Sequence, residues 1–289
     1  VAAPDPVAAA SGAGVTGKLS LAQLAALFAD REAMMQTGGA DAAPTDQWRV
    51  YRFIVDRVQR GEYLRLMVQA SDGTGKSFLL SSAFLRCIVN GIKTNAAAPT
   101  GIAAANIDVK GTDVSGTTIH NMFEMDGEFK SALDDSKFNN SKVSALMQMD
   151  VALFDGVSMM DSDCWSSISE LLSIVDHNKR PDVEAADCFG ALHVVLFGDF
   201  KQLPPATSKP PSNVLPSVFE GVDFSVLRQN RRVVNDHARK AEIDNFHEVL
   251  ADISWGRDTN AVHAFLTRCL LYTSPSPRDL STSRMPSSA

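Results

Sequence analysis

A glycine-rich turn between an apolar stretch and a helical stretch constrains the fold of this chain more than any other feature. Residues 63–70 have the apolar density of a buried strand, and residues 78–90 carry apolar side chains at helical spacing. Between them lie residues 71–77, Ser-Asp-Gly-Thr-Gly-Lys-Ser. Strand, glycine-rich turn and helix, in this order, form the context that a phosphate-binding loop requires. The usual pattern begins with glycine where this chain has Ala70, and a plain glycine-rich helix start with an exposed lysine is the alternative interpretation.

The residue types in this turn suit phosphate and magnesium. Glycines let successive backbone N–H groups point into one concavity, and the N-terminus of the following helix adds partial positive charge. The lysine is expected to reach the outer phosphates of a nucleotide, and the last hydroxyl to ligate Mg²⁺. The nucleotide-binding residues predicted on this basis are Gly73, Thr74, Gly75, Lys76 and Ser77.

Further apolar stretches alternate with helical ones along the chain. The predicted strands are residues 63–70, 93–98, 151–155 and 191–197. Short apolar strands separated by helices are typical of an α/β fold with a parallel sheet flanked by helices. Asp155 and Asp199 come at strand ends, where such sheets bind ligands, and either acid is a candidate magnesium ligand. Either could instead begin an ordinary turn.

The composition excludes several classes of protein. The 289 residues suffice for one large domain or two small ones, and no apolar run approaches the roughly 20 residues that span a bilayer. Four widely spaced cysteines fit neither a zinc site nor a disulfide scaffold, which favours a reducing, intracellular environment. A net charge of −7 argues against coating nucleic acid by bulk charge, although a local basic groove is compatible with it.

The two ends of the chain differ from its centre. Residues 1–18 are mostly small, and we expect them to form a disordered arm. Residues 19–45 are expected to form a helix, with Ser20 as its N-cap, and a linker. Residues 271–289 are rich in serine and proline, lack apolar periodicity and resemble translated sequencing adapter, so we expect a disordered or artefactual tail.

Six short segments occur along the chain in an order that matters for its interpretation. They are residues 73–77 (Gly-Thr-Gly-Lys-Ser), 98–104 (Ala-Pro-Thr-Gly-Ile-Ala-Ala), 116–120 (Gly-Thr-Thr-Ile-His), 155–160 (Asp-Gly-Val-Ser-Met-Met), 198–205 (Gly-Asp-Phe-Lys-Gln-Leu-Pro-Pro) and 227–232 (Leu-Arg-Gln-Asn-Arg-Arg). Together they resemble the motifs of the Pif1-like DNA helicases of superfamily 1, a group that includes the helicase portions of Helitron-type transposons. The resemblance implies a P-loop NTPase lobe of RecA-like fold, expected over residues 46–258, with a truncated continuation over 259–270.

The resemblance also implies roles in the nucleotide site. Gln47 would contact adenine, and Gln202 would contact the terminal phosphate and report its presence to neighbouring loops. Arg232 is the implied arginine finger, for which the adjacent Arg231 could substitute. The implied catalytic residues are Lys76, Asp155, Gln202 and Arg232, the implied magnesium ligands are Ser77 and Asp155, and the implied cofactors are ATP and Mg²⁺.

Two further matched residues concern DNA. Thr100 and His120 lie in segments that face single-stranded DNA in this family, where hydroxyls, backbone N–H groups and rings grip the strand without reading its sequence. His120 taken alone is equally compatible with a structural histidine. The implied partners are single-stranded DNA or DNA junctions, with no membrane, inside the cell and in the nucleus or mitochondrion of a eukaryote. Neither an oligomeric state nor a choice among telomeric, mitochondrial, replicative and transposon-borne duties is implied.

One departure from the family pattern affects the chemistry. Gly156 stands where the family has the glutamate that orients and polarises the attacking water. General-base contributions are about a hundredfold to ten-thousandfold in rate, and glycine has no group that can make one. Asp161 and Asp163 follow too late, in or near the next helix, to be good substitutes. We therefore expect ATP and Mg²⁺ to bind while hydrolysis is slow.

Two functions from different classes follow. The first is the motor lobe of an ATP-dependent 5′–3′ DNA helicase, impaired at Gly156 and lacking the second lobe. The second is a binding module that grips DNA or a partner according to ATP occupancy, without turnover. A phosphate-loop kinase for a small molecule is a weaker third, because residues 98–104 and 198–205 have no evident use there.

Overall fold

The computed structural model describes residues 19–36, 44–112, 115–125, 146, 148–179, 189, 192–207, 219–231 and 240–271. The chain divides into two compact units, Val1–Arg232 and Val233–Ala289, and each is described by itself. The expected arm and all of the expected tail except Leu271 lie outside the described residues.

The first unit is built on one sheet of six parallel strands in the order β3-β2-β4-β5-β1-β6. The strands are β1 (Arg65–Ala70), β2 (Thr94–Ala98), β3 (Thr117–Thr118), β4 (Val151–Phe154), β5 (His193–Gly198) and β6 (Asp223–Leu227). All four residues of β4 are buried, as expected for a central parallel strand that is covered on both faces. The edge strand β6 is exposed at Asp223 and Phe224 and buried only at its last residue.

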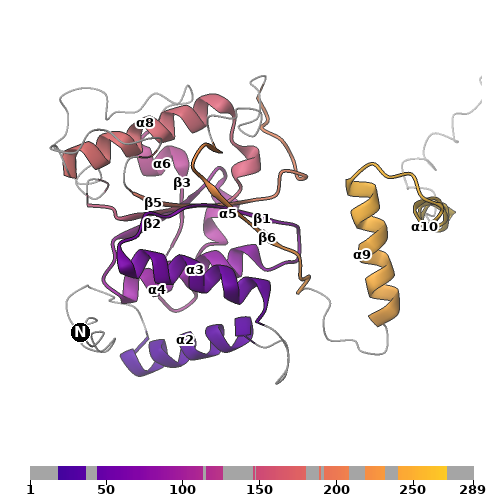
Figure 1. Cartoon of the computed structure of the whole chain (residues 1–289), viewed down its shortest axis with the longest axis horizontal. Coiled ribbons are helices and arrows are strands. Elements are labelled where there is room, and N and C mark those ends of the chain that lie inside the picture. The colour runs from indigo at the N-terminus through magenta and orange to yellow at the C-terminus, as the bar shows by residue number, and fades with distance from the viewer. Residues whose placement is uncertain are drawn as a thin grey trace, which may run out of the picture. The chain divides into compact units, whose positions relative to one another are not determined.

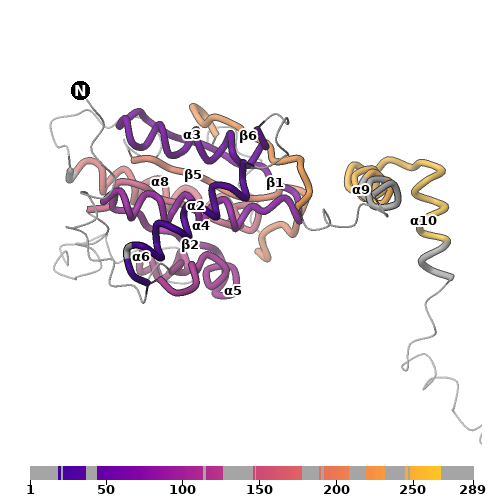
Figure 2. Tube along the Cα trace, turned by 90° about the horizontal axis from the view of Figure 1, so that it is seen from below, coloured from indigo at the N-terminus to yellow at the C-terminus, as the bar shows by residue number. Residues whose placement is uncertain are grey.

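Helices cover both faces of the sheet (Figures 1 and 2). One face carries α2 (Leu21–Gln36), α3 (Asp46–Arg60) and α4 (Lys76–Val89), and the other carries α6 (Ile119–Phe123) and α8 (Ser162–Lys179). A short helix, α5 (Gly101–Ala105), follows β2. The α/β class with a parallel, helix-flanked sheet is therefore confirmed.

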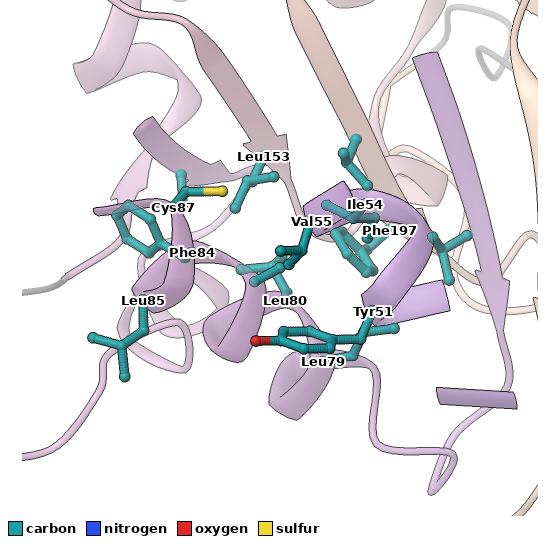
Figure 3. Close-up of a cluster of buried hydrophobic side chains, with 14 of the residues drawn as sticks. Tyr51, Ile54, Val55, Leu79, Leu80, Phe84, Leu85, Cys87, Leu153 and Phe197 are labelled. Atoms are coloured by element: carbon teal, nitrogen blue, oxygen red, sulfur yellow. The ribbon is translucent and has the colours of Figure 1, made fainter. Parts of the chain in front are cut away.

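Alternate residues of the central strands pack into two separate hydrophobic cores, one on each face of the sheet. Val195 and Phe197 of β5 pack on the α3–α4 side, whereas Val194 and Leu196 pack on the α8 side. Figure 3 shows the first core, where Phe197 and Leu153 from the sheet lie near Ile54 of α3 and Leu80 and Phe84 of α4. Each central strand is thus packed on both faces of the sheet, which holds the residues at the strand ends in place.

The second unit contains two helices in its described part, α9 (Lys240–Ser254) and α10 (Asn260–Leu271). Val249 and Val262 are buried, and the rings of Phe246 and Phe265 lie 5.5 Å apart. Across the described residues of both units, no helix combines the length and the apolar character that crossing a bilayer demands.

All four predicted strands are confirmed with small shifts at their ends, and so is the helix predicted near Ser20. Two strands were not predicted. The strand β3 has only two residues. The strand β6 mixes Asp223 and Ser225 with apolar residues, as an edge strand of the described sheet can. Neither shows the apolar run that identifies a buried strand.

Candidate nucleotide-binding and active site

The matched segments meet at one edge of the sheet because every strand pair is parallel. Five of the six segments begin with, or follow, the last residue of a strand, and the sixth, residues 116–120, contains β3. These strand ends are Ala70 of β1, Ala98 of β2, Phe154 of β4, Gly198 of β5 and Leu227 of β6. Segments far apart in sequence are thereby brought to the carboxyl edge of a single sheet.

The phosphate-loop candidate joins β1 to α4 and takes the conformation that its glycines allow. Gly73 and Gly75 have φ angles of 78° and 79°, in the left-handed region that favours glycine. A Cβ added at Gly75 would lie 2.1 Å from Nε2 of Gln47, so a side chain has no room there. The Thr74 side chain folds inward, where its hydroxyl donates to the Ser71 carbonyl at 2.7 Å.

Gln47 lies against this loop and is 3% exposed. Its Nε2 donates to the carbonyl of Thr74 at 2.8 Å and to that of Gly75 at 3.1 Å. The trans peptide geometry places each N–H opposite the preceding carbonyl, so these two bonds direct the N–H groups of Gly75 and Lys76 to the other side of the loop. The structure therefore shows Gln47 supporting the loop backbone, a contact that sequence reasoning did not predict.

Lys76, Ser77 and Asp155 come together from two strand ends. Asp155 follows β4 and is 5% exposed. Burial raises the pKa of its carboxyl, whereas the Lys76 charge, the Gly156 N–H and a hydrogen bond from the Ser77 hydroxyl oppose that rise. A carboxylate and a hydroxyl beside an ammonium provide hard oxygen ligands for Mg²⁺ and a cation for phosphate.

The second candidate acid, Asp199, has a different environment. Its Oδ1 accepts from Gln69 Nε2 at 2.7 Å and from the Lys201 N–H at 3.1 Å, and the Gln69 Oε1 accepts from the Phe200 N–H at 3.2 Å. Asp199 thus stabilises the turn after β5, and Asp155 is the acid beside the loop lysine. Gln202 is exposed in this turn, and its N–H donates to the Asp199 carbonyl.

Gly156 begins a short 3₁₀ helix, η2 (Val157–Met159), in the left-handed conformation with φ 71° and ψ 31°. A Cβ at this position would lie 3.1 Å from Cδ of Pro99. Asp161 does not take the place of the missing glutamate, because its carboxylate accepts from the Cys164 N–H and the Thr207 hydroxyl, each at 2.9 Å. Asp163 is exposed on α8.

The DNA candidates lie together on the β2–β3 side of the sheet. Thr100 caps α5, where its hydroxyl accepts from the Ala103 N–H at 3.2 Å. His120 is the second residue of α6 and is half-buried. The strands that precede them pair directly, with Ala98 opposite Thr118, so both residues follow adjacent strand ends. Ile102 of α5 is 82% exposed on the same short helix.

Arg231 reaches the phosphate-loop candidate, whereas Arg232 lies outside the described residues. The Arg231 N–H donates to the Gly73 carbonyl at 2.7 Å, and its Nη1 donates to the Met34 carbonyl at 3.4 Å. Its Nε and Nη2 are buried and have no hydrogen-bond partner among the described residues. Buried guanidinium nitrogens without acceptors are costly, and a bound anion would satisfy them.

Two residues that support the site were not predicted from the sequence. Gln69 holds the turn after β5, and Asp46 accepts from the N–H groups of Arg228 and Gln229 at 2.6 and 2.9 Å. The only local signal for Gln69 is an uncharged polar residue just before the end of an apolar strand. Asp46 shows no signal beyond its position at the start of a helix.

Comparison with known proteins identifies the family. The pattern of the PIF1-like helicases matches residues 43–263. The ATP-dependent DNA helicase PIF1 of Candida albicans is 28% identical over 166 residues, which cover 54% of this chain and 16% of that protein. The ATP-dependent DNA helicase Pif1 of Bdellovibrio bacteriovorus is 25% identical over 217 residues, 73% of this chain and 44% of that protein. The chain spans less than half the length of these two relatives.

Solved structures agree with this result. A structure of two coordinating Pif1 helicases that unwind forked double-stranded DNA aligns with a TM-score of 0.55 at 25% identity, covering 78% of this chain and 52% of that chain. Pif1 from Bacteroides sp in complex with ADP-AlF4 aligns with a TM-score of 0.52 at 25% identity, covering 76% and 48%. The resemblance inferred from the motifs is therefore confirmed, and the chain belongs to the family of PIF1-like helicases.

Proposed function

We propose that this chain is the nucleotide-binding motor lobe of an ATP-dependent 5′–3′ DNA helicase. The observation that carries the proposal is the convergence of Lys76, Ser77 and Asp155 at the carboxyl edge of the sheet. Three groups of this chemistry bind the phosphates and the Mg²⁺ of a nucleoside triphosphate in P-loop NTPases. The Pif1 from Bacteroides sp, with ADP-AlF4 bound, supports the same ligand class for this chain.

The residues divide the binding of MgATP among them. Lys76 neutralises the outer phosphates, and the N–H groups of Gly75 and Lys76 line the concavity that Gln47 directs them towards. Ser77 and Asp155 hold Mg²⁺, which when bound supplies charge neutralisation between the phosphates. Arg231 is a second cation for the nucleotide, beside the finger role inferred for Arg232, because its Nε and Nη2 have no acceptor in the part of the chain that the structure describes.

DNA is proposed to bind on the β2–β3 side. Thr100, the exposed Ile102 and His120 follow the carboxyl ends of two paired strands there, which suits sequence-independent contacts to a single strand or a junction. The Pif1 pair that unwinds forked double-stranded DNA supports this class of partner. Such a function places the protein inside the cell, at nuclear or mitochondrial DNA in a eukaryote.

A second function is favoured by Gly156. The chain has no carboxylate at this position to polarise the attacking water, and the contacts of Asp161 are structural. A nucleotide-dependent DNA-binding module that turns over slowly would need the same loop, the same magnesium ligands and the same DNA side. The two functions differ only in the rate of hydrolysis.

The test begins with nucleotide binding. We expect the chain to bind ADP and a slowly hydrolysed ATP analogue in the presence of Mg²⁺, and Lys76→Ala to weaken binding about tenfold or more because a charged hydrogen bond to phosphate is lost. Lys110→Ala, a change of an exposed lysine outside the site, is the matched control. Equal binding by Lys76→Ala and the control would refute the proposed site.

The second measurement separates the two functions. DNA-stimulated ATP hydrolysis is measured alongside the affinity for a fluorescent single strand, with and without the ATP analogue. A motor lobe shows DNA-stimulated turnover, whereas a binding module shows nucleotide-dependent DNA affinity with slow turnover. If neither nucleotide nor DNA binds, both functions are excluded.

A further inference from the structure

Asp46 makes three hydrogen bonds that no expected role accounts for. It is the first residue of α3 and is 8% exposed. Its Oδ1 accepts from the Gln47 N–H at 2.7 Å, and its Oδ2 accepts from the N–H groups of Arg228 and Gln229 at 2.6 and 2.9 Å. A buried carboxylate that accepts three backbone N–H groups holds those segments in fixed relative positions.

The two distant N–H groups belong to the segment that leads to Arg231. The pairing of β6 with β1 ends at Leu227, opposite Ala70, so the sheet does not hold the residues that follow. Asp46 holds Arg228 and Gln229, and the Arg231 N–H then bonds to Gly73 of the phosphate loop. This segment is therefore fixed at two points before Arg232.

The start of α3 also fixes the loop itself. Gln47, adjacent to Asp46, donates to the carbonyls of Thr74 and Gly75. Three successive loop carbonyls, those of Gly73, Thr74 and Gly75, are thus engaged either by Gln47 or by the segment that Asp46 holds. These hydrogen bonds link Asp46 to residues 228–231, those residues to the phosphate loop, and the loop back to Gln47, which is adjacent to Asp46.

We propose that Asp46 is a positioning residue that sets the arginine-bearing segment, residues 228–231, against the phosphate loop. Asp46 does not touch the nucleotide in this scheme. It fixes where the Arg231 backbone meets Gly73, and through that contact where the guanidinium group of Arg231 stands relative to the outer phosphate. The inference rests on the proposed nucleotide-binding function and assigns a role to a residue outside the expected set.

This role predicts an effect that depends on the ligand. ADP lacks the outer phosphate, so its affinity depends on the loop and only weakly on the arginines. ADP with AlF4⁻ fills the position of the transferring phosphoryl group, where a displaced arginine is felt most strongly. Loss of Asp46 should therefore weaken binding of ADP–AlF4 far more than binding of ADP.

The experiment measures the affinities of the whole chain for Mg²⁺-ADP and Mg²⁺-ADP–AlF4 by calorimetry. We expect Asp46→Ala to weaken ADP–AlF4 binding about tenfold to a hundredfold and ADP binding less than about threefold, because two of the three lost hydrogen bonds hold the arginine segment and none of them contacts the phosphate loop. Asp46→Asn, whose amide oxygen can still accept from Arg228 and Gln229, should retain most of the affinity. Asp56→Ala, a change elsewhere on α3 at a surface ion pair, should change neither affinity.

The outcomes separate the two levels of inference. If the unchanged chain binds no ADP, the proposed function fails. If it binds ADP and Asp46→Ala lowers the affinities for ADP and ADP–AlF4 by the same factor, or changes only the melting temperature, the positioning role is refuted.

Hydrogen exchange on the unchanged chain guards against a variant that does not fold. The amides of Arg228 and Gln229 should exchange slowly, and more slowly still with ADP–AlF4 than with ADP. Rapid exchange at these amides, or equal protection with both ligands, would overturn the role of Asp46.

Discussion

Gly156 links a backbone conformation to a missing catalytic group. Its left-handed backbone and its closeness to Pro99 mean that a side chain here would be strained by about 1–2 kcal/mol. Glycine at this position therefore agrees with the local structure as well as departing from the family pattern. Restoring glutamate adds a carboxylate and backbone strain together, and a second variant must separate the two effects.

We predict that Gly156→Ala and Gly156→Glu lower the free energy of unfolding by similar amounts, because both carry a Cβ into the left-handed region. Only Gly156→Glu should raise DNA-stimulated ATP hydrolysis, by about a hundredfold, because only glutamate can act as a base. Urea unfolding and a coupled ATPase assay on the three proteins check both parts. Robust and equal hydrolysis in all three would show that the chain does not need a base at position 156.

The buried thiols predict a dependence of stability on pH. Burial raises the pKa of Cys87 to about 12, and burial together with the Asp161 charge raises that of Cys164 to about 12. Below the unfolded value of 9.0 both thiols are neutral in both states. Above it the unfolded thiols ionise while the folded ones stay protonated, so the free energy of unfolding falls as pH rises.

The measurement is urea unfolding between pH 8 and pH 10.5, under reducing conditions. The chain with both Cys87→Ala and Cys164→Ala should show a shallower decline than the unchanged chain, since other groups titrate equally in both. In the native state at pH 8, both thiols should also resist alkylation, and they should react fully in urea. Parallel declines in the two proteins would contradict the predicted coupling.

At the scale of elements, the sequence predicts the strands and loops that a local pattern of apolar and turn residues can encode. Four strands, β1, β2, β4 and β5, are apolar runs that stand next to helical stretches in the sequence. The phosphate loop directly follows β1 and Asp155 directly follows β4, so both could be predicted from this local pattern. The bonds from Gln69 to Asp199 and from Asp46 to Arg228 join residues that are remote in sequence. Periodicity and turn chemistry do not report which remote backbone groups meet, so these supports became visible only in the folded arrangement.

The helix α2 lies outside the matched family range of residues 43–263, and one arginine joins it to α4. Arg31 Nε donates to the Ser82 hydroxyl at 2.8 Å, and Nη2 donates to the Phe78 carbonyl at 3.2 Å and to the Ser81 hydroxyl. The guanidinium also lies 4.3 Å from the centre of the Phe78 ring. Half-buried charged hydrogen bonds of this kind are stronger than surface ion pairs.

We predict that Arg31→Ala lowers the free energy of unfolding by about 1–3 kcal/mol, measured by urea denaturation. The control is Arg52→Ala, which removes an exposed ion pair with Asp56 and should cost less than about 1 kcal/mol. Equal losses in the two variants would mean that Arg31 adds nothing beyond a surface charge. A loss confined to Arg31→Ala would show that α2 is integrated into the nucleotide-binding unit.

At the scale of the whole molecule, the sheet of the described residues bears on whether the chain can unwind DNA. The described residues form a single six-stranded sheet, whereas the family resemblance implies movement between two RecA-like lobes with ATP between them. We predict that residues 1–289 bind nucleotide and single-stranded DNA but do not separate a forked duplex. A strand-displacement assay with ATP tests this, with Pif1 from Bacteroides sp as the positive control, and ATP-dependent unwinding by the chain would contradict it.

The strand order also has a consequence for the order of assembly during synthesis. The phosphate loop follows β1, which lies between β5 and β6 in the sheet. Those two strands, residues 193–198 and 223–227, are synthesised long after β1. Pairings between remote segments form late and slow the folding of a chain. The phosphate loop is thus encoded early, whereas the sheet around its strand is completed late. A nascent chain that ends before residue 223 would leave the backbone N–H and C=O groups on one edge of β1 unpaired.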